Sequence, residues 1–245
     1  MTIAFKALGG EGQDIVLIHG FGSDRLSWLA NSPALLPLGR VHALDLPGHG
    51  GSVADVGDGA PLTLATRVAG SLKVNGVNNA HIIGHSLGGA VALLLATHMP
   101  ELVRSLALIA PLGLGKGVDR NFVEAFPDLA SAEDATKLMQ TLVVRPQLIG
   151  KQVAQRVIEQ LNRDGARDAL RNIALHLRTG FETNIAANVP RLVIWGANDI
   201  TNPLASDKLA AFGGQHEIIE ATAHLPHIEN PRAVNTHLTA FLKTP

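Results

Sequence analysis

The chain has 245 residues and 46% of them are hydrophobic, which allows a sizeable core and excludes a disordered chain. A net charge of -1 gives no reason to expect nucleic acid or an anionic membrane as a partner. The absence of cysteine excludes a thiol nucleophile, disulfide bonds and thiolate metal sites. No signal peptide is recognisable and no apolar run reaches the roughly 18 residues of a membrane span, so we expect a cytoplasmic protein.

Strands and helices alternate through the first half of the chain. Short apolar, β-branched runs predict strands at residues 3–8, 14–19, 40–45, 80–84 and 105–110. Helical patterns lie between them at residues 25–36, 61–75 and 90–99. This alternation predicts an α/β fold with a doubly wound, mostly parallel sheet and right-handed crossovers.

The rhythm changes after Pro111, because no convincing strand follows before Pro190. Helical patterns occupy residues 119–126, 131–144, 146–162 and 164–177 instead, with Ser131 and Asp134 spaced as in a capping box. Strands resume at 191–196 and 216–220, and a final helix is predicted at 231–242. A helical block of this length is no ordinary crossover. We therefore predict a core of residues 1–111 and 190–245 and a helical cap of residues 112–189.

A serine between glycines follows the strand at 80–84, in the pattern Gly84-His85-Ser86-Leu87-Gly88. A sharp turn from strand to helix holds such a serine in a strained conformation and leaves no room for flanking side chains, so glycine fits at both ends of the motif. The turn also aims the N-terminus of the next helix at negative charge forming there. The pattern predicts that Ser86 is a nucleophile; the alternative is a serine that only caps the helix.

Two further polar residues follow later strands. Asp199 comes after the strand at 191–196 and His224 after the strand at 216–220, so the chain order is Ser, Asp, His, as in an α/β-hydrolase triad. A serine hydroxyl needs a neutral imidazole as base, and the imidazole needs a carboxylate to fix its tautomer. Asp199 alone could be a turn residue, and His227 competes with His224; we favour His224 because it lies closer to the strand end.

The loop His19-Gly20-Phe21-Gly22 follows the strand at 14–19 and fits the second part of an oxyanion hole. The predicted donors are the backbone N–H groups of Phe21 and Leu87. We expect His19 to brace this loop, His85 to pack in the turn, and residues 45–52 to form a rigid structural turn. The histidines show no H-E-x-x-H pattern and no Gly-rich phosphate loop is present, so neither a metal nor a nucleotide is expected.

Together these motifs resemble the α/β-hydrolase family over the whole chain. The matching pieces are residues 19–22, 45–52, 84–89, 196–199, His224 and 228–231. The resemblance implies a Ser86–His224–Asp199 triad, an oxyanion hole at Phe21 and Leu87, and no cofactor. One strand precedes the strand at 14–19, where the family usually has two.

Residues 28–31, 44–50 and 106–115 also resemble the hydrolase-like domain of the acetyltransferase component of acetoin dehydrogenase. The chain lacks room for that protein's lipoyl domain, and it lacks the H-x-x-x-D-G motif of lipoyl acyltransferases. We expect a serine hydrolase acting on a small-molecule carboxylic ester or thioester. Acyl transfer to a thiol, dihydrolipoamide or coenzyme A, is the enzyme alternative, and a non-catalytic ligand-binding protein is the other. Hydrolysis of carbon–carbon bonds is disfavoured because histidine, where such relatives tend to have asparagine, precedes Ser86.

The substrate depends on the predicted cap. Apolar helix positions there are candidates for lining a pocket, although they could equally form the core of the cap; they are Phe122, Phe126, Leu138, Met139, Leu142 and Leu148.

Overall fold

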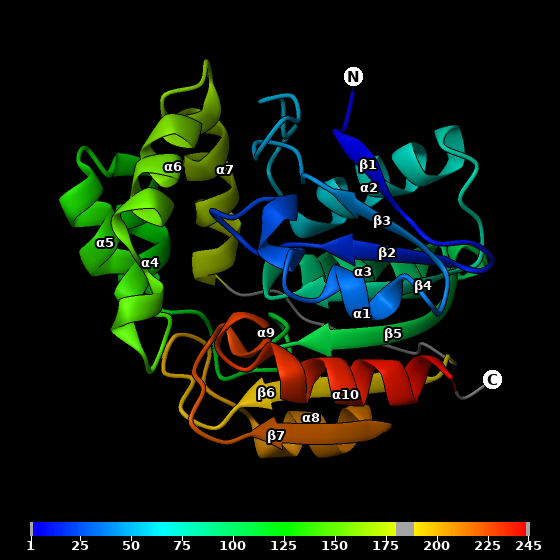
Figure 1. The fold of residues 1–245 in the computed structure, drawn as a ribbon. Coiled ribbons are helices and arrows are strands. Elements are labelled where there is room, and N and C mark those ends of the chain that lie inside the picture. Colours follow the sequence, from blue (N-terminus) through cyan, green and yellow to red (C-terminus); the bar gives the residue numbers. More distant parts are fainter. Residues whose placement is uncertain (1, 180–188, 244–245) are drawn as a thin grey trace.

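A computed structural model describes residues 2–179 and 189–243, which contain one seven-stranded sheet (Figure 1). The strands are β1 (Phe5–Gly9), β2 (Asp14–Ile18), β3 (Arg40–Leu44), β4 (Ala80–His85), β5 (Val103–Ile109), β6 (Arg191–Gly196) and β7 (Gln215–Ile219). Their order across the sheet is β1-β3-β2-β4-β5-β6-β7. Only β1, at one edge, is antiparallel to its neighbour, so the predicted mostly parallel sheet is confirmed.

Helices cover both faces of the sheet, as a doubly wound fold requires (Figure 1). One face carries α2 (Pro61–Val74), α3 (Leu87–His98) and α8 (Ser206–Phe212), and the other carries α1 (Ser32–Leu35) and α10 (Pro231–Leu242). The interior strand β2 is buried throughout and sends alternate side chains into two separate apolar clusters. Continuous apolar runs such as Ile15–Ile18 are therefore needed, because both faces are covered.

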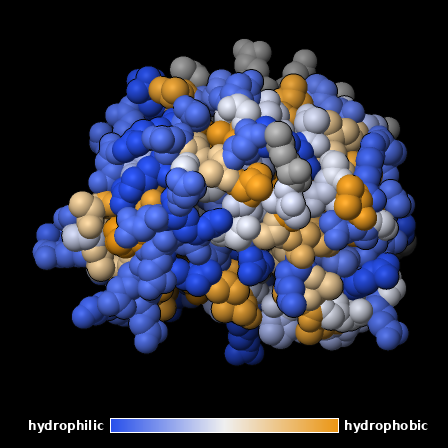
Figure 2. Space-filling model, turned by 90° about the horizontal axis from the view of Figure 1, so that it is seen from above, coloured by the Kyte–Doolittle hydropathy of each residue, from blue (hydrophilic) through white to orange (hydrophobic). Residues whose placement is uncertain are grey.

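Between β5 and β6 the described residues form four α-helices: α4 (Arg120–Ala125), α5 (Ala132–Gln140), α6 (Lys151–Leu161) and α7 (Ala166–Thr179). These cap helices stand together beside the arrowheads of the strands, at the carboxyl ends where ligands bind in open α/β sheets (Figure 1). Figure 2 shows mostly hydrophilic residues on their side of the molecule, with hydrophobic residues in small patches. The boundaries of core and cap stay a prediction, and residues 1, 180–188, 244 and 245 lie outside the described residues.

The predicted helix at 25–36 is wrong as a single element. The chain forms a 3-10 helix, η1 (Arg25–Trp28), and then the separate short helix α1. Pro33 lies in the first turn of α1, where its missing N–H costs nothing, whereas a proline in the middle of one long helix would break it. The Asp24 side chain starts η1 by accepting a hydrogen bond from the Leu26 N–H (2.7 Å).

The predicted helix at 146–162 also divides, into η4 (Pro146–Leu148) and α6, with Gly150 at the boundary. The helix predicted at 131–144 ends earlier, at Gln140. Its N-terminus is capped by Ser131, which accepts from the Asp134 N–H (3.1 Å). Helix α8 and the short helix α9 (Pro226–Glu229) were not predicted. No described helix has the length and apolar character that crossing a membrane requires.

Candidate active site

Ser86 occupies the tight turn between β4 and α3. Its backbone has φ 51° and ψ -115°, a left-handed conformation that strains any residue other than glycine. The turn has no space for larger neighbours: a Cβ atom at Gly84 would overlap the Gly88 backbone, and one at Gly88 would overlap the Ile18 carbonyl. The two glycines of the motif are thus required by steric packing, as predicted.

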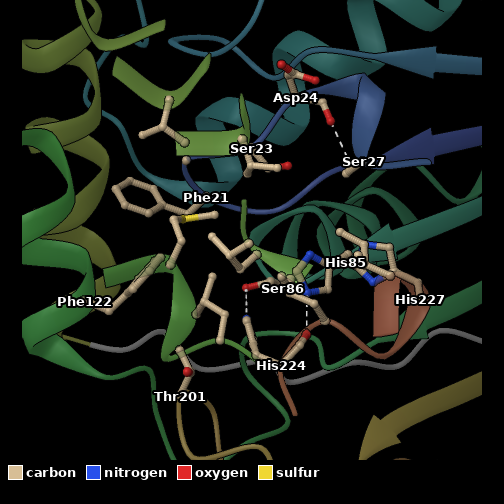
Figure 3. A pocket seen from close by; sticks show the side chains of 18 of the residues that line it. Phe21, Ser23, Asp24, Ser27, His85, Ser86, Phe122, Thr201, His224 and His227 are labelled. Carbon is tan, nitrogen blue, oxygen red and sulfur yellow. Dashed lines mark hydrogen bonds between the residues drawn. The ribbon is translucent and has the colours of Figure 1, made fainter. Parts of the chain in front are cut away.

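Ser86, His224 and Asp199 meet at the carboxyl ends of three strands. The Ser86 Oγ lies 3.0 Å from His224 Nε2 (Figure 3), and His224 Nδ1 lies 2.8 Å from Asp199 Oδ2. All three residues are buried. The structure therefore brings together the three residues that the sequence put forward, and it brings His224 rather than His227 to the serine.

The hydrogen bonds of Asp199 set the tautomer of His224. Oδ1 of Asp199 accepts from the backbone N–H groups of Thr201 (3.0 Å) and Asn202 (2.9 Å), which leaves Oδ2 facing the imidazole. A carboxylate only accepts, so His224 Nδ1 carries the proton and Nε2 presents a lone pair toward Ser86. This is the arrangement in which an imidazole can take a proton from a serine hydroxyl.

Two further histidines, His85 and His227, lie close to His224. His85 donates from Nε2 to the His224 carbonyl oxygen (2.9 Å), and its ring lies between those of His224 and His227. Burial lowers the pKa of His85 well below its usual range and that of His227 to about 3, so both rings are neutral at neutral pH. Both ring nitrogens of His227 lack a hydrogen-bond partner among the described residues. His85 packs in the turn as expected, but its bond to His224 was not foreseen.

The loop after β2 is braced by His19, as predicted. His19 Nδ1 donates to the Gly20 carbonyl (2.8 Å), and Nε2 accepts from the Leu46 N–H (2.9 Å). Phe21 of this loop borders the cavity described below, and Leu87 is the first residue of α3, where a backbone N–H has no partner within the helix. Their role as oxyanion donors stays a prediction.

The turn at 45–52 is structural, as the sequence indicated. Asp45 is buried and pairs with Arg25, whose backbone N–H it also accepts (2.7 Å). The second Asp45 oxygen accepts from the Gly51 N–H (2.7 Å), and Ser52 donates to the Asp45 carbonyl (2.5 Å). These bonds close the turn on itself and leave no group of Asp45 for the site.

Glu229 joins the His224 loop to the cap and was not assigned a role from the sequence. Its buried carboxylate accepts from the Ala223 N–H through Oε1 (2.6 Å) and from the Val144 N–H through Oε2 (2.8 Å). The His224 N–H itself donates to the carbonyl oxygen of Leu142, which belongs to the segment after α5 (3.0 Å). The only sequence signal was the presence of Glu229 in one of the motifs shared with the resembled family.

A cavity of about 440 Å³ lies beside Ser86, between the strand ends and the cap helices (Figure 3). Four of the predicted pocket residues line it: Phe122, Met139, Leu142 and Leu148. Phe126 and Leu138 do not line it and follow the alternative, a place in the apolar core. The Phe126 ring packs against the Phe21 ring (5.6 Å between centroids), and half-buried Leu138 packs on the core. An apolar helix position can face either the cavity or the apolar core.

Residues of two other segments line the cavity and were missed. They belong to η1 and its flanks and to α6; Asp24, Leu26, Ser27, Leu29, Gln152, Val153, Arg156 and Gln160 are among them. Arg156 donates to Asp24 Oδ2 from Nε (2.8 Å) and from an Nη atom (2.7 Å), which ties α6 to the start of η1. No group of three potential metal ligands occurs among the described residues.

The parallel sheet and the serine in its strained turn define an α/β-hydrolase. The model of the alpha/beta hydrolase family matches residues 15–237, so the chain belongs to this family. It is 35% identical over 244 residues to the dihydrolipoyllysine-residue acetyltransferase component of the acetoin cleaving system of Pseudomonas putida. That match covers 96% of this chain but 65% of the relative, so the chain spans less than two thirds of that protein.

Other similarities cover both partners almost fully. The chain is 30% identical to pimeloyl-[acyl-carrier protein] methyl ester esterase of Aeromonas hydrophila, over 91% of this chain and 92% of the relative. The crystallised meta-cleavage product hydrolase of Pseudomonas fluorescens superposes with a TM-score of 0.85 at 21% identity, over 98% of this chain and 93% of that one. The latter likeness shows the fold alone. The family and its relatives support an enzyme with hydrolase activity.

Proposed function

We propose that the protein is a serine hydrolase that cleaves a carboxylic ester or thioester through an acyl-enzyme. The observation that carries the proposal is the buried chain of hydrogen bonds from Ser86 through His224 to Asp199, beside a largely apolar cavity. The relative named as a methyl ester esterase acts on the same bond class, which supports the proposal.

In the proposed reaction the Ser86 oxygen attacks the carbonyl carbon while His224 Nε2 takes the hydroxyl proton. The carbonyl oxygen becomes an oxyanion, for which the N–H groups of Phe21 and Leu87 are the proposed donors. Collapse of this intermediate breaks the ester bond, and His224 returns the proton to the leaving alcohol or thiol. Water then attacks the acyl-serine by the same steps and releases the acid, and Ser86 is regenerated.

The test is hydrolysis of p-nitrophenyl butanoate by Ser86→Ala. We expect kcat to fall by about 10⁴-fold or more, because the remaining donors and binding contacts alone give only a residual rate. Ser71→Ala, on α2, is the matched control and should keep its activity. Unchanged hydrolysis by Ser86→Ala would refute the mechanism.

Acyl transfer to a thiol is the second candidate, and the similarity to an acetyltransferase component favours it. The same acyl-enzyme would then be resolved by dihydrolipoamide or coenzyme A instead of water. Partition of the acyl group decides between the two: acyl-thiol formed at the expense of free acid, at millimolar thiol, indicates transfer. Free acid as the only product indicates hydrolysis.

A further inference from the structure

The exposed residues that line the cavity mark its opening. Among the described lining residues, the exposed ones all lie on two segments, one around η1 and one formed by η4 and α6; they are Leu26, Leu29, Ala30, Leu148, Gln152, Val153 and Arg156. The first segment belongs to the core and the second to the cap. The opening therefore lies between them, and a substrate must pass it to reach Ser86.

Large apolar side chains from both segments form the rim of this opening. Leu26 and Leu29 are 38% and 66% exposed, and Leu148 and Val153 are 37% and 39% exposed. We call these four residues the apolar mouth. Single exposed hydrophobic residues are ordinary, but a group around the entrance of a cavity indicates contact with an apolar ligand.

The charge at the rim is already neutralised. Arg156 gives two of its donors to Asp24, a buried carboxylate that also accepts from Gln160 Nε2 (3.3 Å). A substrate carboxylate or phosphate would have to compete with Asp24 for Arg156. The rim therefore favours an uncharged, apolar group over an anionic one.

We propose that the apolar mouth binds the aliphatic chain of the substrate, and that the substrate is an uncharged ester or thioester whose chain extends from Ser86 out to this rim. The proposal rests on the serine hydrolase function proposed above and adds the class of substrate. Burial of the chain against the apolar mouth removes apolar surface from water, which favours binding in proportion to the area buried. Each added methylene should therefore raise kcat/KM until the chain passes the rim.

The test compares long and short esters below their solubility limits. For wild type we expect kcat/KM to rise from butanoate to decanoate p-nitrophenyl esters, or from butyl to decyl acetate if the alcohol side carries the chain. The double variant Leu29→Ser/Val153→Ser changes one residue of the apolar mouth on each of the two segments. It should lower the ratio of kcat/KM for long esters to kcat/KM for short esters by about 10-fold. Both positions are exposed, so the fold should tolerate the changes.

Val74→Ser is the matched control, because Val74 is 87% exposed on α2 and does not line the cavity. It should keep the wild-type ratio. The proposal is overturned if both ester series favour short chains, if the double variant keeps the ratio, or if its loss appears only with substrate presented in phosphatidylcholine vesicles. In each case hydrolysis of short esters that depends on Ser86 would still support the proposed function, whereas no hydrolysis of any ester or thioester would refute both proposals.

Discussion

The strand-end loops of the core and the cap helices meet at one cavity, but different forces hold them in place. In the loops, backbone geometry fixes the positions of the side chains. Ser86 lies in a strained turn that only small neighbours allow, and backbone N–H groups orient Asp199. In the cap, the packing of apolar side chains on amphipathic helices holds the helices in place, and many such side chains could replace one another. The loops therefore set the proposed chemistry, and the cap shapes the space for a substrate.

Several polar contacts join the two regions, and two of these junctions lie beside the cavity. On one side of the cavity Arg156 of α6 reaches Asp24, and on the other side Glu229 and the His224 N–H bind backbone groups of residues 142–145. The second junction lies directly beside the proposed base. A change there should move His224, while a change on the outer helices should not.

The largest effect is expected from Asp199→Asn. The Thr201 and Asn202 N–H groups should hold the amide oxygen of the new side chain, so its NH₂ group faces His224 Nδ1 and forces the proton onto Nε2. In that tautomer the imidazole cannot accept the Ser86 proton, and kcat should fall by about 10⁴-fold. Ester hydrolysis measures this; Asp207→Asn, on α8, is the control. Activity within about 10-fold of wild type would show that the carboxylate does not set the tautomer.

A large loss of stability is expected from Gly88→Ala. The new methyl group would overlap the carbonyls of Ile18, the last residue of β2, and of His19, the residue directly after it, and this backbone cannot move aside. We expect a loss of about 4 kcal/mol or more in the free energy of unfolding, or no folded protein. Gly70→Ala, in α2, meets no atom within 4 Å and should be stabilising by up to about 1 kcal/mol. Urea unfolding compares the pair, and similar values for both would contradict the steric account.

Glu229→Ala tests the junction between His224 and the cap. Removing the carboxylate leaves the Ala223, Val144 and Arg145 N–H groups without their acceptor and frees the His224 loop. A shift of about 1 Å in the base should lower kcat by about 10²-fold. Because Glu229 acts through position, KM should change little, and Glu229→Gln, which keeps one acceptor oxygen, should recover part of kcat. Exposed Glu220→Ala is the control; an equal loss in the Gln variant, or a loss in KM alone, would refute the positioning role.

A smaller effect concerns stability at low pH. Burial lowers the pKa of His227 to about 3 in the folded protein, against about 6.5 in the unfolded chain. Below pH 6.5 the unfolded state therefore binds more protons, and stability falls as the pH decreases toward 3. His227→Phe removes this contribution and loses no hydrogen bond, since both ring nitrogens lack partners among the described residues. Between pH 7 and pH 5 the variant should lose about 2 kcal/mol less than wild type. Urea unfolding at both pH values measures this. An equal loss of unfolding free energy in the variant and in wild type would contradict the prediction.

The predictability of each region follows from the range of the interactions that form it. The turn at Ser86 and the individual strands depend on local backbone rules, so short motifs in the sequence were enough to predict them. Glu229 and the Asp24–Arg156 pair depend on contacts across 85 and 132 positions, which no local pattern encodes. The sequence left the roles of Phe126 and Leu138 open for a related reason: periodicity identifies the buried side of a helix but not whether that side faces the core or the cavity.

The most direct test of the central claim, that His224 activates Ser86 as a nucleophile, is covalent labelling. The native protein is treated with a fluorophosphonate, and intact mass followed by peptide mapping locates the adduct. We predict one phosphonyl group, on the Ser86 oxygen, with labelling abolished in Ser86→Ala and strongly slowed in His224→Ala. An unlabelled wild-type protein, or an adduct on another residue, would contradict the account and favour a ligand-binding protein that retained only the fold.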